Sequence, residues 1–151
     1  MKKADFLVIT IILLISIGFY AIYFSNNLIS SDSYGIEIYY NNQKVFEEAL
    51  EETTKVTVCL DVEDVVLYVK VDRNNDGIYE STKEYLNLVS TPTHTHNVVH
   101  IEYGNIHMVE ANCENKLCLN MRIGKTLATP IFCTNNVLIK LVTNDYKIIT
   151  G

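Results

Sequence analysis

The sequence predicts an all-β domain, a small β-barrel or sandwich, preceded by one N-terminal transmembrane helix. Two observations lead to this prediction. The first is an uncharged apolar run over residues 6–24, and the second is a change after residue 33 to short alternating segments separated by turn residues. About eight to ten short strands, with turns every eight to twelve residues, are typical of small barrels and sandwiches.

The apolar run reads FLVITIILLISIGFYAIYF and, as a helix, spans about 28 Å, close to the thickness of a bilayer's hydrocarbon core. Lys2 and Lys3 precede it and no basic residue follows closely, which predicts a cytoplasmic N-terminus and an extracellular C-terminal part. A cleaved signal peptide is the alternative, but it usually has a shorter apolar core and a small-residue cleavage site, which residues 25–27 lack. We therefore expect residues 1–24 to be an uncleaved single-pass anchor in the cell membrane.

The polar residues 25–33 are expected to form a tether, and residues 34–151 an extracellular β domain. The chain has 12 basic and 18 acidic side chains, a formal charge of −6, and no cluster of lysine or arginine. This charge distribution argues against binding of nucleic acid or anionic lipid through a basic patch. The predicted partners are the membrane, through the anchor, and a protein at the cell surface.

Alternation of apolar and polar residues predicts the strands of the domain. They are expected over residues 36–40, 44–50, 55–60, 65–71, 98–103, 106–110, 137–143 and 146–150. The fourth of these, VVLYVKV, has the highest β propensity. Turns are expected at Asn41-Asn42, Gly104-Asn105 and Asn144-Asp145, and residues 81–95 are expected to be irregular.

The segment DRNNDGIYE, which follows the fourth predicted strand, contains a partial calcium motif. Asp72, Asn74 and Asp76, followed by glycine, match the start of a calcium loop, in which short oxygen ligands alternate. The twelfth position is lysine in place of the usual glutamate. A plain hairpin turn, for which Asn-Asp-Gly is suitable without metal, is the preferred interpretation. Calcium binding by Asp72, Asn74, Asp76 and Glu80 is the alternative hypothesis.

Four histidines occur close together, at positions 94, 96, 100 and 107. His94 and His96 would share a face if they lay in a strand, which makes metal binding conceivable. Surface histidines in a threonine-rich loop are the preferred interpretation. The sequence marks no hydroxyl or thiol as activated by a neighbouring base, so we expect no catalytic residues and no enzymatic activity.

The chain contains four cysteines: Cys59, Cys113, Cys118 and Cys133. In an exported domain an even number of cysteines favours structural disulfides, although the sequence does not choose among the possible pairings. Cys113 and Cys118 are more widely spaced than the usual C-x2-C zinc knuckle. A metal site or a thiol-redox site that uses Cys113, Cys118 and Cys133 is the alternative hypothesis.

The segment NVVHIEYGNIHMVEANCENKLCLNMRIGKTLATPIFCTNNVLIKLV, together with the anchor and the two-stranded start over residues 35–50, carries a family resemblance. It resembles the NusG domain II-containing small membrane proteins of Gram-positive bacteria. In that family a strand leads into Cys-x4-Cys, a looped segment follows, and a later strand ends in a third cysteine. Here those cysteines are Cys113, Cys118 and Cys133, and residues 137–142 supply the final Val/Ile-rich strand.

The chain also departs from the family pattern. Glu114-Asn115 stand where the family often has Pro-Asp, no tryptophan follows Cys118, and residues 61–96 look like an insertion. The resemblance implies a compact β-barrel-like domain outside the membrane, without an established catalytic activity. We therefore expect a membrane-anchored extracellular interaction or accessory module stabilised by disulfide. The alternatives are a thiol-redox or metal-binding protein and a calcium-stabilised surface or adhesion protein.

Overall fold

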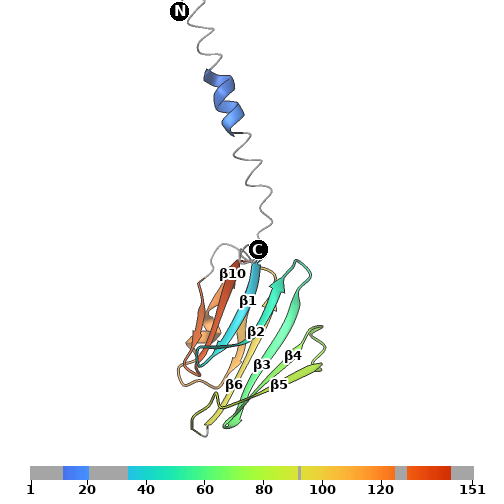
Figure 1. The fold of residues 1–151 in the computed structure, drawn as a ribbon, viewed down its shortest axis with the longest axis vertical. Coiled ribbons are helices and arrows are strands. Elements are labelled where there is room, and N and C mark those ends of the chain that lie inside the picture. The colour runs from blue at the N-terminus through green and yellow to red at the C-terminus, as the bar shows by residue number, and fades with distance from the viewer. Residues whose placement is uncertain (1–11, 21–33, 92, 125–128, 144–151) are drawn as a thin grey trace, which may run out of the picture. The chain divides into compact units, whose positions relative to one another are not determined.

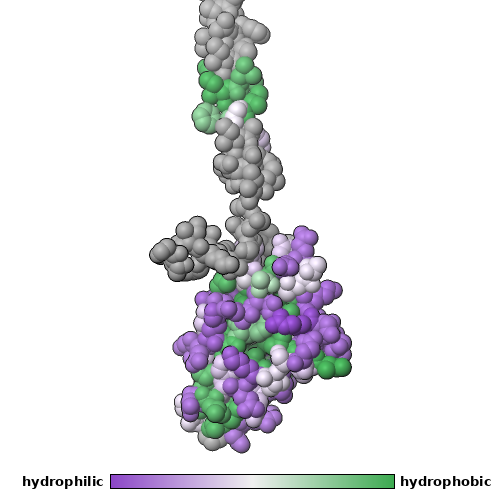
Figure 2. Space-filling view, turned by 45° about the vertical axis from the view of Figure 1, so that its right-hand side comes forward, coloured by the Kyte–Doolittle hydropathy of each residue, from purple (hydrophilic) through white to green (hydrophobic). Residues whose placement is uncertain are grey.

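The computed structural model of the chain describes residues 12–20, 34–91, 93–124 and 129–143. It divides into two units, Met1–Asp32 and Ser33–Gly151. In the first unit, the described residues form a helix over positions 12–20, whose mostly apolar side chains are exposed and appear green in Figure 2.

No helix among the described residues is both long and apolar enough to cross a membrane. The predicted span over residues 6–24 extends beyond the helix at 12–20 in both directions, and those extensions lie outside the described residues. The same is true of the predicted tether over residues 25–33 and of the predicted last strand over residues 146–150.

The second unit is a β domain built from two antiparallel sheets (Figure 1). One sheet has four strands in the order β2-β1-β10-β9, and the other has six in the order β5-β4-β3-β6-β7-β8. A short 3-10 helix, η1 (Leu117–Asn120), precedes β8. The strands are β1 (Tyr34–Tyr40), β2 (Gln43–Leu50), β3 (Lys55–Asp64), β4 (Val66–Asp72), β5 (Ser81–Leu86), β6 (Thr93–Glu102), β7 (Asn105–Ala111), β8 (Arg122–Gly124), β9 (Ile131–Cys133) and β10 (Val137–Thr143). The predicted all-β class is thereby confirmed as two antiparallel sheets.

Alternating apolar residues place the core between the two sheets. On β3, every second residue from Val56 to Val62 is buried, and on β1 Ile36 and Ile38 are fully buried. Both sets belong to one hydrophobic cluster, together with Ile139 of β10. The side chains that point the other way are mostly polar, and hydrophilic residues dominate the face seen in Figure 2.

The first and last described strands of the domain lie side by side. β1 pairs with β10 along its whole length, from Tyr34 opposite Thr143 to Tyr40 opposite Val137. The residues predicted as an insertion, 61–96, begin within β3 and end within β6, and they contain β4 and β5. They therefore extend the six-stranded sheet to its edge strand.

The prediction that residues 81–95 are irregular is wrong. Residues 81–86 form β5, and β6 begins at Thr93. β5 is an edge strand, and nearly all of its residues are exposed, so it lacks the alternation that reveals a half-buried strand. β6 pairs with β3 over ten residues, from Lys55 opposite Glu102 to Asp64 opposite Thr93.

Candidate functional site

Three of the four cysteines meet in the interior of the domain. Cys113 follows β7, Cys118 lies in η1, and Cys133 ends β9. The Sγ atoms of Cys113 and Cys118 are 3.4 Å apart, and those of Cys118 and Cys133 are 3.2 Å apart. All three sulfurs lie within 4.8 Å of one another, and their residues are 3%, 1% and 8% exposed. We call this group the cysteine trio.

A tight turn between β7 and η1 brings the first two sulfurs together. Lys116 adopts the left-handed conformation, with φ of 52°, immediately before η1. This conformation is uncommon for a residue other than glycine, and it reverses the chain within a few residues. The N–H of Leu117 donates to the side chain of Asn115 at 3.4 Å, and the N–H of Met121 donates to the carbonyl of Cys118 at 3.3 Å.

A buried amide lies against the trio. Asn97 of β6 is fully buried, and its Nδ2 donates to Cys133 Sγ and to Met108 Sδ, each at 3.3 Å. Its Oδ1 accepts a hydrogen bond from Asn135 at 3.1 Å. An N–H donor aimed at a sulfur stabilises the thiolate form, because the acceptor gains negative charge on ionisation. Asn97 therefore offers Cys133 Sγ a donor that a metal-bound thiolate would retain.

Within the trio, the pKa values of Cys113 and Cys118 are shifted in opposite directions. Burial acts to raise the pKa of Cys113, but hydrogen bonds from Cys118 and Cys133 outweigh it, so the pKa of Cys113 is lowered. Burial raises the pKa of Cys118, and hydrogen bonding with Cys133 and Cys113 raises it further. The contacts within the trio thus favour the thiolate at Cys113 and the protonated thiol at Cys118.

The predicted disulfides are not formed in the structure. All four cysteines, each of which lies in the described part of the chain, are free thiols. A disulfide requires a sulfur–sulfur distance of about 2.05 Å, so Cys118 Sγ would have to approach the sulfur of Cys113 or of Cys133 by more than 1 Å. The fourth candidate, Cys59, belongs to a different group of side chains.

The trio is closer to the geometry of a metal site. Zinc–sulfur bonds of about 2.3 Å place the sulfurs of a tetrahedral centre about 3.8 Å apart. Sulfurs that are 3.2 and 3.4 Å apart reach that spacing by separating by roughly half an ångström. Among the described His, Cys, Asp and Glu residues, the group has these three members. Three thiolates suit Zn²⁺ or Cu⁺, with any fourth ligand supplied from solution.

A second group combines Cys59 and Asp61 of β3 with His96 of β6. Cys59 Sγ donates to Asp61 Oδ2 at 3.3 Å, and Asp61 Oδ1 lies 2.5 Å from His96 Nδ1. Cys59 and Asp61 point away from the core, because Val58, Leu60 and Val62 occupy the inward positions of β3. We call this group the outer-face cluster.

The charges of the outer-face cluster are coupled. Burial acts to raise the pKa of Asp61, but hydrogen bonds from Lys70, His96 and Cys59 outweigh it and lower the pKa. The hydrogen bond with Asp61 raises the pKa of His96. Burial, followed by the charge of Asp61, raises the pKa of Cys59 to about 12. A thiol with that pKa is a poor nucleophile at neutral pH, because the thiolate is the reactive form.

The Asp72 segment has the hydrogen bonds of a plain turn. Asp72 is 3% exposed; its Oδ1 accepts the N–H groups of Asn74 and Asn75 at 3.2 and 2.7 Å, and its Oδ2 accepts that of Gly77 at 2.9 Å. Asp76 accepts the N–H of Ile78 at 2.8 Å.

Glu80, the last of the proposed calcium ligands, accepts the N–H of Arg73 at 2.8 Å. Asp72, Asp76 and Glu80 do not form one of the ligand groups found among the described residues. The hydrogen bonds favour the preferred interpretation, a plain turn. Calcium binding by this segment stays a prediction.

All four histidines lie on strands, as predicted for His100 and His107, so the predicted placement of His94 and His96 in a loop is wrong. His94, His96 and His100 occupy alternate positions of β6 and share its outer face, opposite Glu63, Asp61 and Thr57 of β3. The rings of His100 and His107 of β7 stand edge to face with centroids 5.6 Å apart. Of the four, His96 is the one in a ligand group among the described residues.

No family model, curated protein or solved structure matches the chain. The resemblance to the NusG domain II-containing proteins therefore stays a prediction. Sequence reasoning named the three cysteines of the trio, but it missed Asn97, Asp61 and the role of Cys59 beside His96. Asn97 did leave a signal, since it shares the inward face of β6 with Val99 and Ile101. A polar residue at a core position is an indicator of a buried polar contact.

Proposed function

We propose that the β domain binds a transition-metal ion with an affinity for sulfur, Zn²⁺ or Cu⁺, through the cysteine trio. The observation that supports this most strongly is the convergence of three buried sulfurs from separate segments of the chain. A disulfide would use two of them and leave the third thiol buried beside the bond. A metal ion uses all three in one centre.

The surroundings of the trio fit a bound cation. Ionised cysteines are the metal-binding form, and three thiolates in a buried site require a positive charge among them. The lowered pKa of Cys113 favours its ionisation, and the Asn97 amide offers a hydrogen bond to Cys133 Sγ in the metal-bound state. A metal ion supplies the positive charge that the three thiolates require, and the cysteines release their protons to solvent as it binds.

The proposal keeps the cellular placement predicted from the sequence. The uncharged run over residues 6–24 supports a membrane anchor, and the lysines ahead of it support an extracellular β domain. We propose that this domain is an accessory module of the cell surface that holds a metal ion. Of the functions predicted from the sequence, metal binding is the one to which the structure gives named ligand atoms.

Metal titration of the full-length chain, purified in detergent and freed of metal by chelation under reductant, tests the proposal. Zn²⁺ affinity is measured by competition with a chromophoric chelator, and the bound ions are counted after dialysis. We expect Cys118→Ser to remove one equivalent of bound Zn²⁺ per chain, whereas Glu114→Gln, at an exposed neighbouring position, retains it. Unchanged stoichiometry in Cys118→Ser would contradict the proposal.

Alkylation of the trio separates metal binding from structural disulfides. Before reduction, the chain is alkylated in denaturant with a chelator, so that burial does not block any thiol, and each cysteine is located by mass spectrometry. We expect Cys113, Cys118 and Cys133 all to react once the metal is removed. Two members blocked until reductant is added would show a disulfide and overturn the proposal.

A further inference from the structure

We propose that Cys59, Asp61 and His96 form a second metal site, for a divalent cation of the zinc class, on the outer face of the six-stranded sheet. These three residues are separate from those of the trio. It adds a mixed sulfur, oxygen and nitrogen site to the all-sulfur site proposed above. Both the ligand set and its exposure to solvent differ between the two.

The distances within the outer-face cluster suit a cation of this size. Zinc bonds of about 2.0–2.3 Å place unlike donors of a tetrahedron about 3.3–3.6 Å apart. Cys59 Sγ lies 3.3 Å from the Asp61 carboxylate and 4.0 Å from His96 Nδ1, each within about half an ångström of that range. The 2.5 Å contact between Asp61 and His96 is a hydrogen bond, and it opens by roughly 1 Å when a metal replaces the shared proton.

A carboxylate behind the histidine completes the arrangement. Glu110 Oε2 of β7 lies 3.3 Å from His96 Nε2, the ring nitrogen on the far side from Asp61. Histidines that bind metal through one nitrogen commonly donate the other N–H to a carboxylate, which fixes the ring and makes the ligating nitrogen more basic. Glu110 is placed for this role, so His96 Nδ1 is the expected ligating atom.

The local charge matches a divalent ion. Lys70 Nζ lies 2.7 Å from Asp61 Oδ2, which steadies the carboxylate and leaves Oδ1 on the side of His96. When an incoming ion displaces the proton of Cys59 to solvent, the resulting thiolate and the carboxylates of Asp61 and Glu110 carry three negative charges, and Lys70 carries one positive charge. The net charge of −2 balances one divalent cation without a further counter-ion.

The sheet holds the three ligands in place before any ion arrives. Asp61 and His96 lie directly opposite each other in the β3–β6 ladder, and Cys59 lies two residues along the same face of β3. Ligands on paired strands are positioned more precisely than ligands on loops. Cys59 is 2% exposed, whereas the His96 side chain is 35% exposed, so the cluster is closed on the sulfur side and open at the histidine. A metal here retains a coordination position for water or an exogenous ligand.

Co²⁺ and Zn²⁺ titrations in a Cys118→Ser chain test this site separately from the trio. With the trio disabled, we expect one equivalent of Co²⁺ with the near-ultraviolet charge-transfer absorption of a thiolate ligand. His96→Gln and Cys59→Ser should each weaken Zn²⁺ binding by about 100-fold or more, and Glu110→Gln by about 10- to 100-fold. His94→Gln is the matched control, because His94 lies on the same face of β6 outside the ligand group.

The outcomes for the two sites are distinguishable. Zn²⁺ binding by the Cys118→Ser chain that survives both His96→Gln and Cys59→Ser overturns the second site, as does the absence of binding by that chain. Loss of all binding in Cys59→Ser with the trio intact would instead contradict the trio. Should Cys59→Ser fail to fold, the thiolate charge-transfer absorption of Co²⁺ in the Cys118→Ser chain decides the question, because the site predicts its loss in His96→Gln and its retention in His94→Gln.

Discussion

At the scale of single residues, Asn97 is the polar group on which the trio depends most directly. Its side chain is fully buried, and its amide donates to Cys133 and Met108. We predict that Asn97→Leu, which keeps the approximate volume, weakens Zn²⁺ binding by the trio by about 10- to 100-fold, because the thiolate loses its supporting donor. Competition with a chelator measures the change. Asn120→Ala, at an exposed position of η1, is the control, and equal affinity in the Asn97 variant would contradict the assigned role.

Asp72 offers a second prediction at this scale. The turn depends on its two oxygens, which accept three backbone N–H groups from a site that is almost fully buried. Asp72→Ala should lower the free energy of unfolding by about 2–3 kcal/mol, since buried donors lose a charged acceptor. Asp76→Ala, at an exposed position, should lower the free energy of unfolding by less. Urea denaturation of the purified variants compares the two.

The same turn tests the calcium hypothesis. If the segment binds calcium, the ion raises the melting temperature of the parent chain and leaves that of Asp76→Ala unchanged. If it is a plain turn, millimolar calcium leaves both unchanged. Thermal melts with calcium and with chelator separate the two interpretations.

The residue types of the site could be predicted from the sequence, but the contacts between residues far apart in the chain could not. The sequence identifies all four cysteines and allows a metal site, because those residues are chemically distinctive wherever they lie. It does not reveal that Cys133 meets Cys113 and Cys118, since this contact requires β9 to pair with β10 and the chain to reverse at Lys116. Cys59 was grouped with the wrong residues for the same reason. Its true neighbour, His96, is set by the β3–β6 register.

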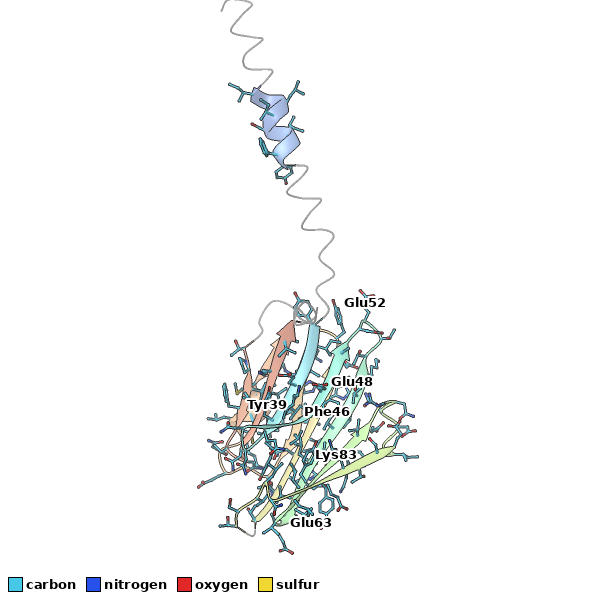
Figure 3. All side chains as sticks on the ribbon, in the orientation of Figure 1. Tyr39, Phe46, Glu48, Glu52, Glu63 and Lys83 are labelled. Carbon is cyan, nitrogen blue, oxygen red and sulfur yellow. The ribbon has the colours of Figure 1, made fainter. Side chains whose placement is uncertain are left out.

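At the scale of secondary-structure elements, β1 carries a small charged network on its outer face. Glu37 accepts a hydrogen bond from Tyr39, which is labelled in Figure 3, at 2.8 Å. It also pairs with Lys44 of β2 and Lys140 of β10, each at 3.2 Å. The network therefore connects three adjacent strands of the four-stranded sheet.

This network makes the stability of the sheet depend on pH. Burial acts to raise the pKa of Glu37, but Tyr39, Lys140 and Lys44 outweigh it, so the folded pKa lies below the usual 4.5. A lowered folded pKa gives stability that is present above the unfolded pKa and is lost as the pH falls through the folded value. We predict that Glu37→Gln costs up to about 1 kcal/mol at pH 7 and much less at pH 3.

Urea denaturation at the two pH values measures this difference. Glu52→Gln, at the exposed turn between β2 and β3 labelled in Figure 3, is the matched control. A penalty for Glu37→Gln that is the same at pH 7 and pH 3 would show that the network does not stabilise the sheet through the carboxylate charge.

Strands with one buried face were predictable, and the exposed edge strand β5 was not. β1, β2, β3, β4 and β7 all lie close to their predicted segments, since burial of alternate residues leaves a period of two in the sequence. β5 has no such period because most of its residues are exposed. The first part of β6 has threonine and histidine in place of large apolar residues, so its pairing with β3 was not visible.

At the scale of the whole molecule, the trio connects the two sheets. Cys113 and Cys118 follow β7 of the six-stranded sheet, and Cys133 ends β9 of the four-stranded sheet. We predict that Zn²⁺ stabilises the entire domain, by about 4 kcal/mol when free Zn²⁺ is 1,000 times the dissociation constant. Urea denaturation with Zn²⁺ and with chelator should show this difference in the parent chain. Cys133→Ser should lose the Zn²⁺-dependent stabilisation that the trio provides. An equal gain in stability with Zn²⁺ in that variant would contradict the inference that the trio connects the two sheets.

Because β1 pairs with β10, the four-stranded sheet cannot be completed until β10 has been synthesised, long after β1. All strands of the six-stranded sheet lie between residues 55 and 124, so that sheet is complete in sequence before β10 is synthesised. Ribosomes add about 5–20 residues per second, so β1 waits roughly 5–20 s for its partner. During that interval one edge of β1 offers unpaired backbone groups to other newborn chains. Cys133 arrives equally late, so the three-sulfur centre is assembled only as the sheet closes.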